Sequence, residues 1–382
     1  MSTGDADERP LLVVCAGTPW DGPAGSDRLL TTALTRYARV LWVDPPVSLA
    51  NPAALRRARV VPELVQVHPD ITRITPVVAP LHTRAGIRHL TPHLVRGQIA
   101  AALRRLRARP YAVFDCRLGR MLGGWGPQVR NVLYGTDDFV AGAQLMGRRV
   151  AQVEAEERAA LASADLVLAV STTLVRRWTA MGASVLLVPN GVQTAAYRDL
   201  DTVTPAADVT LTPPIAGVVG HLSARIDIDL LDLVVDEGCS LLLVGPYDPR
   251  WEPERFHRLC ARPQVQWVGP RPYERMPSYL RHIDVGLTPY TDTAFNRAAF
   301  PLKTLEYLGA GRPVVSTDLP ATRWLDTDLI FVTADSSEFG KAVREMAVHP
   351  VDPAAAVRRR AFAERHSWPA RAASVAKAIG LR

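Results

Sequence analysis

The stretch FPLKTLEYLGAGRPVVSTDLP, residues 300–320, decides how the second half of this chain folds. Proline suits the first position of a helix because its missing N–H would have had no partner there, so the pattern predicts a short helix beginning at Pro301. Gly309 and Gly311 allow that helix to end, and the β-branched run that follows predicts a buried strand from Val314.

The charged residues of this predicted helix form a candidate anion site. The first N–H groups of a helix have no partner within it and attract anions. Lys303 adds a mobile cation, and Glu306 shares its face because it lies three residues further on. A nucleotide diphosphate, with its phosphates and hydroxyls, fits this combination. An ordinary amphipathic helix with a solvated Lys–Glu pair is the alternative interpretation.

Composition indicates a soluble globular protein of two ordinary domains. The chain has 382 residues, 48% of them hydrophobic, and no apolar run approaches the roughly 18 residues that cross a bilayer. The polar start MSTGDADERP has the wrong flank for a signal peptide. The four cysteines show no metal or CxxC spacing, which predicts free thiols in a reducing, cytoplasmic compartment.

The net charge of +7 is concentrated in the first half of the chain. Residues 1–200 hold 24 arginines against 16 acidic residues, a balance of +8, and the remainder is close to neutral. Within the basic stretch 87–110, Leu94, Ile99, Leu103 and Leu106 form an apolar stripe. We favour a surface helix with that stripe in the core over a helix lying on an anionic membrane. No nucleic-acid module accompanies the charge, so nucleic acid is not expected as a partner.

Short apolar runs alternate with helical patterns, which predicts an α/β fold with parallel sheets covered on both faces. The polar, proline-rich segment 192–213 interrupts the series and predicts a linker. The expected organisation is a first Rossmann-like domain over 1–191, a second over 214–365 and a C-terminal helix over 366–382. In two such sheets the ligand crevice lies at the carboxyl ends of the strands, between the domains.

Four motifs in this order resemble the GT-B glycosyltransferases, close to family 4 and its teichuronic-acid-type relatives. The motifs are VLLVPNGV (185–192), AGVVGHLSARIDIDLL (216–231), VQWVGPRPYERMPSYLRHIDVGLTPY (265–290) and the opening stretch. The resemblance runs through most of residues 130–380 and is weaker before them. It implies a GT-B fold of two Rossmann-like domains with parallel sheets facing a central cleft, and a C-terminal helix that crosses back to the first domain.

The resemblance also implies a nucleotide-sugar site in the second domain. There Glu306 would hold the ribose hydroxyls, and amides at the helix start would cradle the diphosphate with Lys303. The expected site residues are Glu306, Lys303, Arg225, His221, Gly220, Ala299, Phe300, Leu302, Arg297 and Asn296.

The sequence departs from the family pattern at two points. Many members carry a second glutamate eight positions before Glu306, where Ala298 stands here. Many also carry an Arg…Lys pair in the first phosphate loop, where this chain has His221 and, one position out of register, Arg225. Asn296 and Asp292 are the remaining candidates for a sugar contact.

The glycine-rich loop GTPWDGPAGSDRLL (17–30) is the candidate acceptor site. It follows the first strand, in a position that faces the cleft in GT-B proteins. Gly17 leaves room for a ligand, and Trp20 and Asp21 could stack on and hydrogen-bond an acceptor sugar. A tight turn with Asp27 capping the next helix explains the loop equally well.

Asp137 and Asp138 follow a predicted strand and are the candidate catalytic bases, with Asp138 preferred as the cleft-facing residue. An inverting transferase needs a base for the acceptor hydroxyl, whereas a retaining one could use the leaving phosphate. Asp115 competes for the same role, and a capping aspartate is the structural alternative.

No cofactor and no metal ion are expected. Family resemblance implies metal-independent catalysis, because helix dipole and basic side chains neutralise the diphosphate. The DID triplet at 227–229 resembles a metal motif of other transferases, but its position predicts a helix cap.

The sequence therefore predicts a glycosyltransferase that moves a sugar from a nucleotide diphosphate sugar, with UDP first, to a hydroxyl acceptor in cell-envelope polysaccharide or natural-product glycoside synthesis. A non-catalytic GT-B partner subunit and a sugar-nucleotide epimerase on the same fold are the alternatives. The expected location is cytoplasmic, with peripheral contact at the inner membrane face through the basic first domain left open.

Overall fold

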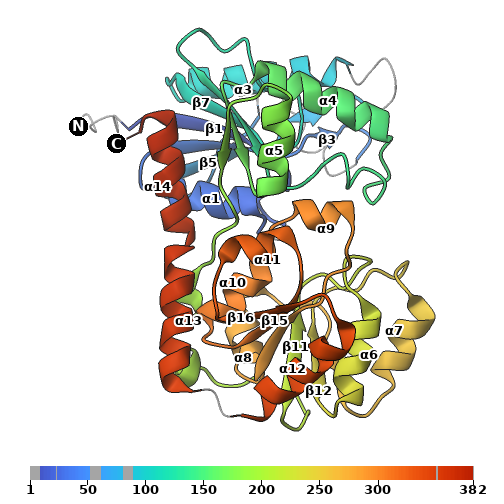
Figure 1. Ribbon diagram of the computed structural model, residues 1–382. Helices are drawn as coiled ribbons and strands as arrows, with labels where there is room; N and C mark the ends of the chain where they lie inside the picture. Colours follow the sequence, from blue (N-terminus) through green and yellow to red (C-terminus); the bar gives the residue numbers. More distant parts are fainter. Residues whose placement is uncertain (1–8, 23, 52–61, 81–88, 350–351, 382) are drawn as a thin grey trace. The chain divides into compact units, whose positions relative to one another are not determined.

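The computed structural model describes residues 9–22, 24–51, 62–80, 89–349 and 352–381. The chain divides into two compact units (Figure 1). Unit 1 comprises the chain up to Val170, Leu174–Pro189 and the chain from Arg371 onward, and unit 2 comprises Ser171–Thr173 and Asn190–Ala370.

Unit 1 is built on an eight-stranded sheet in the order β10-β9-β8-β7-β1-β2-β5-β4. Its neighbouring strands pair in parallel except β4, which runs antiparallel to β5. A separate parallel pair joins β3 and β6. The strands are β1 (Leu11–Cys15), β2 (Arg39–Val43), β3 (Val47–Ser48), β4 (Val65–His68), β5 (Ile71–Ile74), β6 (Val77–Val78), β7 (Pro110–Asp115), β8 (Arg130–Gly135), β9 (Leu166–Ala169) and β10 (Val185–Leu187).

Helices cover both faces of this sheet, as the fully buried strand β1 requires. The helices are α1 (Ser26–Leu34), α3 (Thr91–Arg105), α4 (Val150–Ser163) and α5 (Thr172–Ala180), which begins in unit 2. Val95, Ile99 and Leu103 of α3 belong to the core under the sheet. The apolar stripe of the basic helix therefore faces the core as favoured, except Leu94, which is exposed; residues 87 and 88 of that stretch lie outside the described residues.

Unit 2 is built on a six-stranded, fully parallel sheet in the order β13-β12-β11-β14-β15-β16. The strands are β11 (Ile215–Val219), β12 (Ser240–Val244), β13 (Val265–Trp267), β14 (Val285–Thr288), β15 (Val314–Thr317) and β16 (Ile330–Thr333). The helices are α6 (Ile228–Asp236), α7 (Pro253–Cys260), α8 (Met276–Leu280), α9 (Ala294–Ala298), α10 (Leu302–Gly309), α11 (Pro320–Leu325), α12 (Ser336–Val348), α13 (Pro353–Arg365) and the start of α14 (Trp368–Ile379). The buried side chains of α6, α7 and α12 share one core with strand residues of the sheet.

The segment 192–213, expected as a linker, is packed onto unit 2. It contains two 3₁₀ turns, Thr194–Tyr197 and Leu200–Thr202, in which Tyr197 and Leu200 are fully buried. The Tyr197 hydroxyl lies 3.0 Å from that of Tyr273. The polar composition of the segment gave no sign that Tyr197 and Leu200 pack into the core of unit 2.

The chain from Arg371 onward belongs to unit 1. The Tyr111 hydroxyl donates a 2.7 Å hydrogen bond to the carbonyl of Ile379, at the end of α14. Burial lowers the pKa of Arg371, which lies in the same helix, to about 10. The last helix is therefore tied to β7 by a specific hydrogen bond.

The four cysteines carry no disulfide. Cys15, Cys116 and Cys239 are buried, as predicted, and Cys260 is half-buried. Burial raises the pKa of the Cys15 thiol to about 12 and that of Cys260 to about 11. Among the described residues, no helix combines the length and apolar character that crossing a membrane requires.

Tight helix packing on the sheet of unit 2 predicts that Gly286→Ala is destabilising. A Cβ at Gly286 would lie 2.2 Å from the Tyr307 ring, so an alanine forces the ring or the strand to shift. We expect a loss of about 1–3 kcal/mol, the usual effect of overpacking a core, seen as a lower melting temperature.

Gly97→Ala is the matched control, because its Cβ would meet no atom within 4 Å in the middle of α3. It should leave stability unchanged or raise it by up to about 1 kcal/mol through helix propensity. Equal melting temperatures for the two variants would contradict the packing described for Tyr307.

Candidate functional site

Two glycines bring the loops after β11 and β12 into direct contact at the carboxyl edge of the unit 2 sheet. Gly220 has φ +140° and Gly245 has φ +142°, a region that disfavours other residues. A Cβ on Gly245 would lie 1.9 Å from the Gly220 carbonyl oxygen. The result is a half-buried backbone surface at Gly220, with Gly245 buried against its carbonyl.

Helix α10 begins beside this backbone surface. A Cβ on Gly220 would lie 3.5 Å from Cε of Lys303, so the lysine stem runs alongside the glycine. Pro301 was predicted to be the first residue of the helix, but it is the N-cap, and α10 begins at Leu302. No side chain caps the first turn. The first N–H groups of α10 therefore keep their positive polarity for an external anion.

Lys303 and Glu306 form an ion pair on the first turn of α10, which confirms that they share a face. Lys303 Nζ donates to Glu306 Oε2 at 2.7 Å. The Glu306 side chain is 3% exposed and that of Lys303 22% exposed. A buried carboxylate beside a half-buried ammonium is far from the solvated pair of the alternative interpretation, because exposed pairs keep both groups in water.

Tyr307, which sequence reasoning missed, fixes the orientation of this helix. Its hydroxyl accepts from the Val219 N–H at 2.8 Å and donates to the Gly217 carbonyl at 3.2 Å. Its ring fills the space above Gly286. Isolated glycines within two apolar strands were the available signal, because such glycines often mark a close approach.

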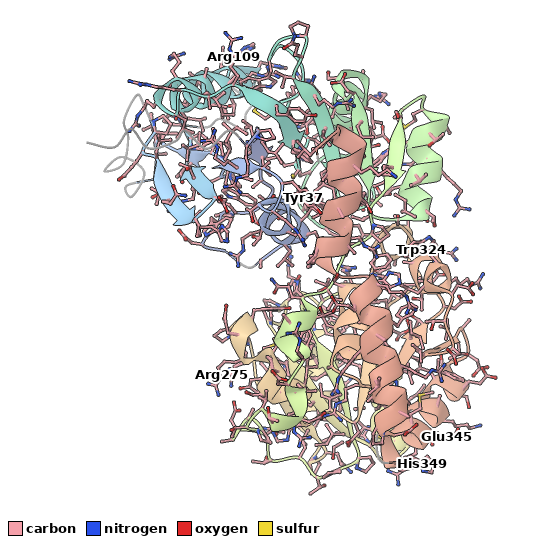
Figure 2. The ribbon with its side chains drawn as sticks, turned by 90° about the vertical axis from the view of Figure 1, so that its left-hand side faces the viewer. Tyr37, Arg109, Arg275, Trp324, Glu345 and His349 are labelled. Atoms are coloured by element: carbon pink, nitrogen blue, oxygen red, sulfur yellow. The ribbon has the colours of Figure 1, made fainter. Side chains whose placement is uncertain are left out.

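The backbone before α10 is held by three side-chain donors. Ser171 donates to the Ala298 carbonyl at 2.6 Å, Thr173 to the Arg297 carbonyl at 3.0 Å and Asn190 to the Phe300 carbonyl at 3.1 Å. Trp324 of α11 is labelled in Figure 2. Its ring lies edge-on to the Phe300 ring and to His366, with centroids 5.8 and 5.9 Å apart. Phe300 is therefore held through both its carbonyl and its ring. Leu302, the first residue of α10, is half-buried.

The Ala299 amide does not fit its predicted role at the diphosphate. It donates to the carbonyls of Phe295 and Asn296, closing α9. The prediction placed this residue in the following helix turn and did not foresee α9. The predicted role of the Phe300 amide and of the first α10 amides stays a prediction.

Arg225 and Asn296 form one structural unit. Arg225 Nε donates to Asn296 Oδ1 at 2.9 Å, and the guanidinium lies 5.0 Å from the Phe295 ring centroid and 5.4 Å from that of Tyr290. Asn296 is 2% exposed, and its Nδ2 donates to the carbonyls of Arg225 and Thr291. Asn296 thus orients Arg225, and its amide is too engaged for a sugar contact.

The remaining predicted residues of unit 2 have plainer surroundings. Arg297 pairs with Asp292, and both side chains are more than half exposed. His221 is exposed on the loop after β11. Asp227 is the N-cap of α6 and accepts from the Asp229 N–H, which confirms the cap predicted for the DID triplet.

In unit 1, the predicted acceptor loop is braced by two aspartates. Asp27 accepts from the Gly17 N–H at 2.8 Å and stands inside α1, whose N-cap is Gly25, so its predicted role as the cap is wrong. Burial raises the pKa of Asp27. The Trp20 N–H donates to Asp44, which fixes the tryptophan backbone.

The side chains of Trp20 and Asp21 differ in exposure. Trp20 packs edge-on against Trp42 with centroids 5.2 Å apart, and Arg28 lies 5.4 Å from its ring centroid. Asp21 is 79% exposed and pairs with Arg73 at 2.6 Å. The half-buried Trp20 is thus a fixed ring at the end of β1, as stacking on a ligand requires.

Asp138, the preferred candidate base, is fully engaged by the protein. Its Oδ1 accepts from the N–H groups of Val140 and Ala141, and its Oδ2 accepts from Arg177 at 2.6 Å. Arg177 also pairs with Glu157. Burial raises the pKa of Glu157, and the charge of Arg177 opposes this shift. These contacts indicate a turn cap and ion-pair partner, the structural alternative, whereas the neighbouring Asp137 is half-buried.

Asp115 has a comparable structural role. It is fully buried and accepts from the N–H groups of Arg117, Gly119 and Met121. The carboxylate therefore organises the loop after β7 and is not presented to a substrate.

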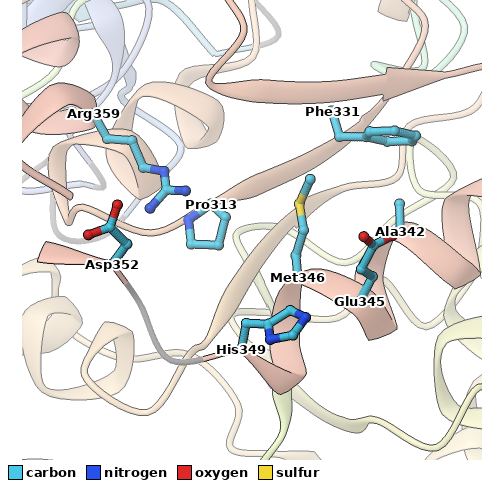
Figure 3. A pocket seen from close by; sticks show the side chains of 8 residues that line it. All are labelled: Pro313, Phe331, Ala342, Glu345, Met346, His349, Asp352 and Arg359. Carbon is cyan, nitrogen blue, oxygen red and sulfur yellow. The ribbon is translucent and has the colours of Figure 1, made fainter. Parts of the chain in front are cut away.

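A cavity of about 380 Å³ in unit 2 lies at the opposite, amino edge of the sheet (Figure 3). Pro313, which precedes β15, lies on its wall with Met346 and His349 of α12. It is therefore separate from α10's first turn. Within the described ranges, no group of three or more acidic, histidine or cysteine side chains is placed to hold a metal ion.

Residues 213–348, which contain the α10 site, match the family described as Glycosyl transferases group 1. A 119-residue region is 33% identical to the putative teichuronic acid biosynthesis glycosyltransferase TuaH of Bacillus subtilis (strain 168). That region spans 31% of this chain and 30% of TuaH.

The fold resembles solved glycosyltransferase-type structures over nearly the whole chain. Sucrose-phosphate synthase from Thermosynechococcus elongatus has a TM-score of 0.71 at 18% identity, covering 97% of this chain and 98% of its own. HepE from Anabaena, in complex with UDP and glucose, has a TM-score of 0.64 at 15% identity, covering 97% and 99%. A UDP-forming trehalose-phosphate synthase from Burkholderia xenovorans has a TM-score of 0.69 at 12% identity, covering 97% and 99%.

Residues 213–348 thus match a glycosyltransferase family, and the chain as a whole has the GT-B fold. In this GT-B protein the family match falls on unit 2, where the bare backbone of Gly220 and the Lys303–Glu306 pair lie together. The fold class predicted from the sequence is confirmed.

The ion pairs of Asp138 predict that Asp138→Asn destabilises this GT-B protein. The change removes the charge that Arg177 pairs with and weakens two hydrogen bonds, for an expected loss of about 1–3 kcal/mol. Thermal unfolding followed by circular dichroism measures it.

Asp328→Asn is the control, since Asp328 and its partner Arg358 are both well exposed. Exposed pairs contribute at most about 1 kcal/mol, so its melting temperature should stay near that of the parent. If Asp138→Asn had the same melting temperature as Asp328→Asn, the structural role given to Asp138 would be wrong.

Proposed function

We propose that this protein transfers a sugar from a nucleotide diphosphate sugar to a hydroxyl acceptor. The observation that carries the proposal is the pair of the half-buried Lys303 and the buried Glu306 near the start of α10, beside the half-buried backbone of Gly220. A cation, a carboxylate and free helix amides within one turn match a diphosphate joined to a ribose.

Glu306 is assigned to the ribose. Its Oε2 accepts from Lys303, and its second carboxylate oxygen can accept from a vicinal ribose hydroxyl. At 3% exposure the carboxylate sits in a poorly hydrated environment, where a charge-assisted hydrogen bond is stronger than in water.

Lys303, the α10 amides and Arg225 are assigned to the diphosphate. Lys303 is flexible and half-buried, so its ammonium can bind a phosphate oxygen while staying near Glu306. Arg225 is oriented by Asn296 and by two aromatic rings. These positive groups stabilise the negative charge that develops on a departing nucleotide diphosphate.

UDP is the first candidate for the nucleotide, and a cell-envelope acceptor is the first candidate for the product. HepE is described in complex with UDP and glucose, and the Burkholderia xenovorans protein as UDP-forming. TuaH is described as a putative teichuronic acid biosynthesis glycosyltransferase. These descriptions support the same chemistry for this chain.

The acceptor base remains a proposal that falls on Asp137. Both carboxylate oxygens of Asp138 already accept hydrogen bonds, from Arg177 and from two backbone amides. In an inverting reaction Asp137 would accept the proton of the acceptor hydroxyl, and Asp137→Asn would lower kcat by about 10²–10⁴-fold. In a retaining reaction the leaving phosphate accepts it, and the anomeric configuration of the product distinguishes the two.

Nucleotide binding is the first test of the proposed function. In a thermal-shift and calorimetry panel of UDP, GDP and TDP, we expect UDP to bind, and Glu306→Ala to weaken its binding about 10- to 150-fold. That range corresponds to a lost hydrogen bond to a charged group of roughly 1.5–3 kcal/mol. Asp328→Asn, which removes an exposed charge in the same unit, should bind UDP like the parent.

Unchanged UDP affinity in Glu306→Ala would refute the assignment of the ribose contact. Turnover is tested by incubating the protein with UDP-sugars and measuring UDP release with and without acceptor. Acceptor-dependent UDP release is expected. Release without acceptor, or none with any sugar, would favour an epimerase or a non-catalytic subunit instead.

A further inference from the structure

A second groove, of about 840 Å³, lies in unit 1 at the carboxyl edge of its sheet. One wall is the start of α3, with Thr91, Pro92 and Val95, and the floor is the loop 117–121 that follows β7. The other wall is the segment 147–149 with the first turns of α4. Strands β7 and β1 are parallel neighbours in the middle of the sheet. The strand order continues from β1 to β2 on one side and from β7 to β8 on the other, and such a reversal of order is where open α/β sheets bind ligands.

Four arginines and a single acidic residue line this groove: Arg117, Arg120, Arg148, Arg149 and Glu156. Arg148 pairs with Glu156 at 2.5 Å, and Gln152 donates to the other oxygen of Glu156 at 2.9 Å. Both oxygens of this carboxylate therefore already accept a hydrogen bond from a neighbouring side chain. Three arginines remain without a compensating charge among the lining residues.

Arg117 is the most telling of these arginines. Its Nε is buried and has no hydrogen-bond partner among the described residues. A buried, unpaired guanidinium nitrogen is costly, and such groups are normally paired. The same residue lines the groove, so the positive charge of its guanidinium acts on an anion bound there.

The loop that carries Arg117 and Arg120 is rigidly built. Leu118 has φ +58° and Arg120 has φ +57°, two left-handed conformations that are unusual outside glycine. Asp115 holds the loop from below through three N–H groups. From α3, Arg96 donates to the carbonyls of Arg120 and Gly123. Strained backbone held from both sides is typical of binding loops.

The N-terminus of α4 adds to the positive field. The helix has 14 residues, its N-cap is Arg149 without a side-chain cap, and its first turn holds no acidic residue. Ala151 and Gln152 of that turn line the groove. The positive end of the helix dipole therefore acts in the same direction as the arginines.

Exposed apolar side chains flank both walls. Leu90 and Leu94 stand on the α3 side, 59% and 45% exposed, and Leu145 and Met146 on the α4 side, 52% and 50% exposed. Exposed apolar side chains of this size are available to contact the apolar part of a bound molecule.

We propose that this groove binds the phosphate or diphosphate group of a phosphorylated acceptor. The inference rests on the proposed function only in calling the ligand an acceptor; the anion site itself stands on unit 1 alone. Arg117 and Arg149 bind the anion from the floor and from the α4 wall, and Arg120 screens its remaining charge. The apolar flanks receive the non-phosphate part of the same molecule, which is the chain of a lipid phosphate or the body of a soluble phosphate ester.

Pyrophosphate is the probe for the anion site. It is titrated calorimetrically into Arg117→Gln/Arg149→Gln and into Arg36→Gln/Arg109→Gln, both in a Lys303→Met background that weakens the α10 site. Arg36 and Arg109 are exposed in unit 1 and do not line the groove, so the two pairs of changes remove the same charge. We expect at least about 10-fold weaker binding for the groove pair only.

Equal pyrophosphate affinity in the two double variants would overturn the proposal. If the groove pair does not fold, Arg149→Gln alone replaces it, because this exposed side chain is free to change. UDP affinity is measured on both pairs with Lys303 intact and should match the parent. If the unaltered protein did not bind UDP, the proposed function would be refuted, whereas the result with pyrophosphate would still test the groove.

Vesicles identify the source of the phosphate. Binding to phosphatidylglycerol vesicles over phosphatidylcholine vesicles, lost in the groove pair and in Leu94→Ser/Leu145→Ser, supports a lipid phosphate. Pyrophosphate binding without vesicle binding supports a soluble phosphate ester. Vesicle binding that both arginine pairs reduce equally reflects general surface charge and counts against the groove.

Discussion

The position of α10 depends on one buried hydroxyl. Tyr307 bridges the Val219 N–H and the Gly217 carbonyl, at 2.8 and 3.2 Å, where β11 ends, and its ring occupies the space that Gly286 leaves open. Burial raises the pKa of this hydroxyl, so it stays protonated and keeps its donor. Because Tyr307 follows Glu306 directly, the contact that anchors the helix also sets the direction of the carboxylate.

Both units place positive groups at the carboxyl edge of a parallel sheet, but they do so differently. Unit 2 uses backbone: two close glycines and an uncapped helix start, with Lys303 as a mobile charge. Unit 1 uses fixed side chains, with arginines on a loop that Asp115 holds.

Local sequence patterns predicted the elements that depend on neighbours in the chain. The apolar runs predicted parallel strands, and the three-residue spacing predicted the Lys303–Glu306 pair. Contacts between distant segments escaped prediction. Nothing near Asp138 shows that Arg177, on a later helix, would occupy it, and the short helix α9 that engages the Ala299 amide has no strong periodicity. The antiparallel β4 was missed for the same reason, since its pairing with β5 depends on a turn between two weakly apolar segments.

The most direct test of the α10 site compares the affinities of UDP and UMP for the protein and for Lys303→Met by calorimetry at fixed ionic strength. The two ligands differ by the β-phosphate, which the helix start and Lys303 should bind. We expect the protein to bind UDP at least about 10-fold more tightly than UMP, and Lys303→Met to lose most of that preference while UMP affinity changes little. A preference for UDP that survives unchanged in Lys303→Met would show that the diphosphate binds elsewhere.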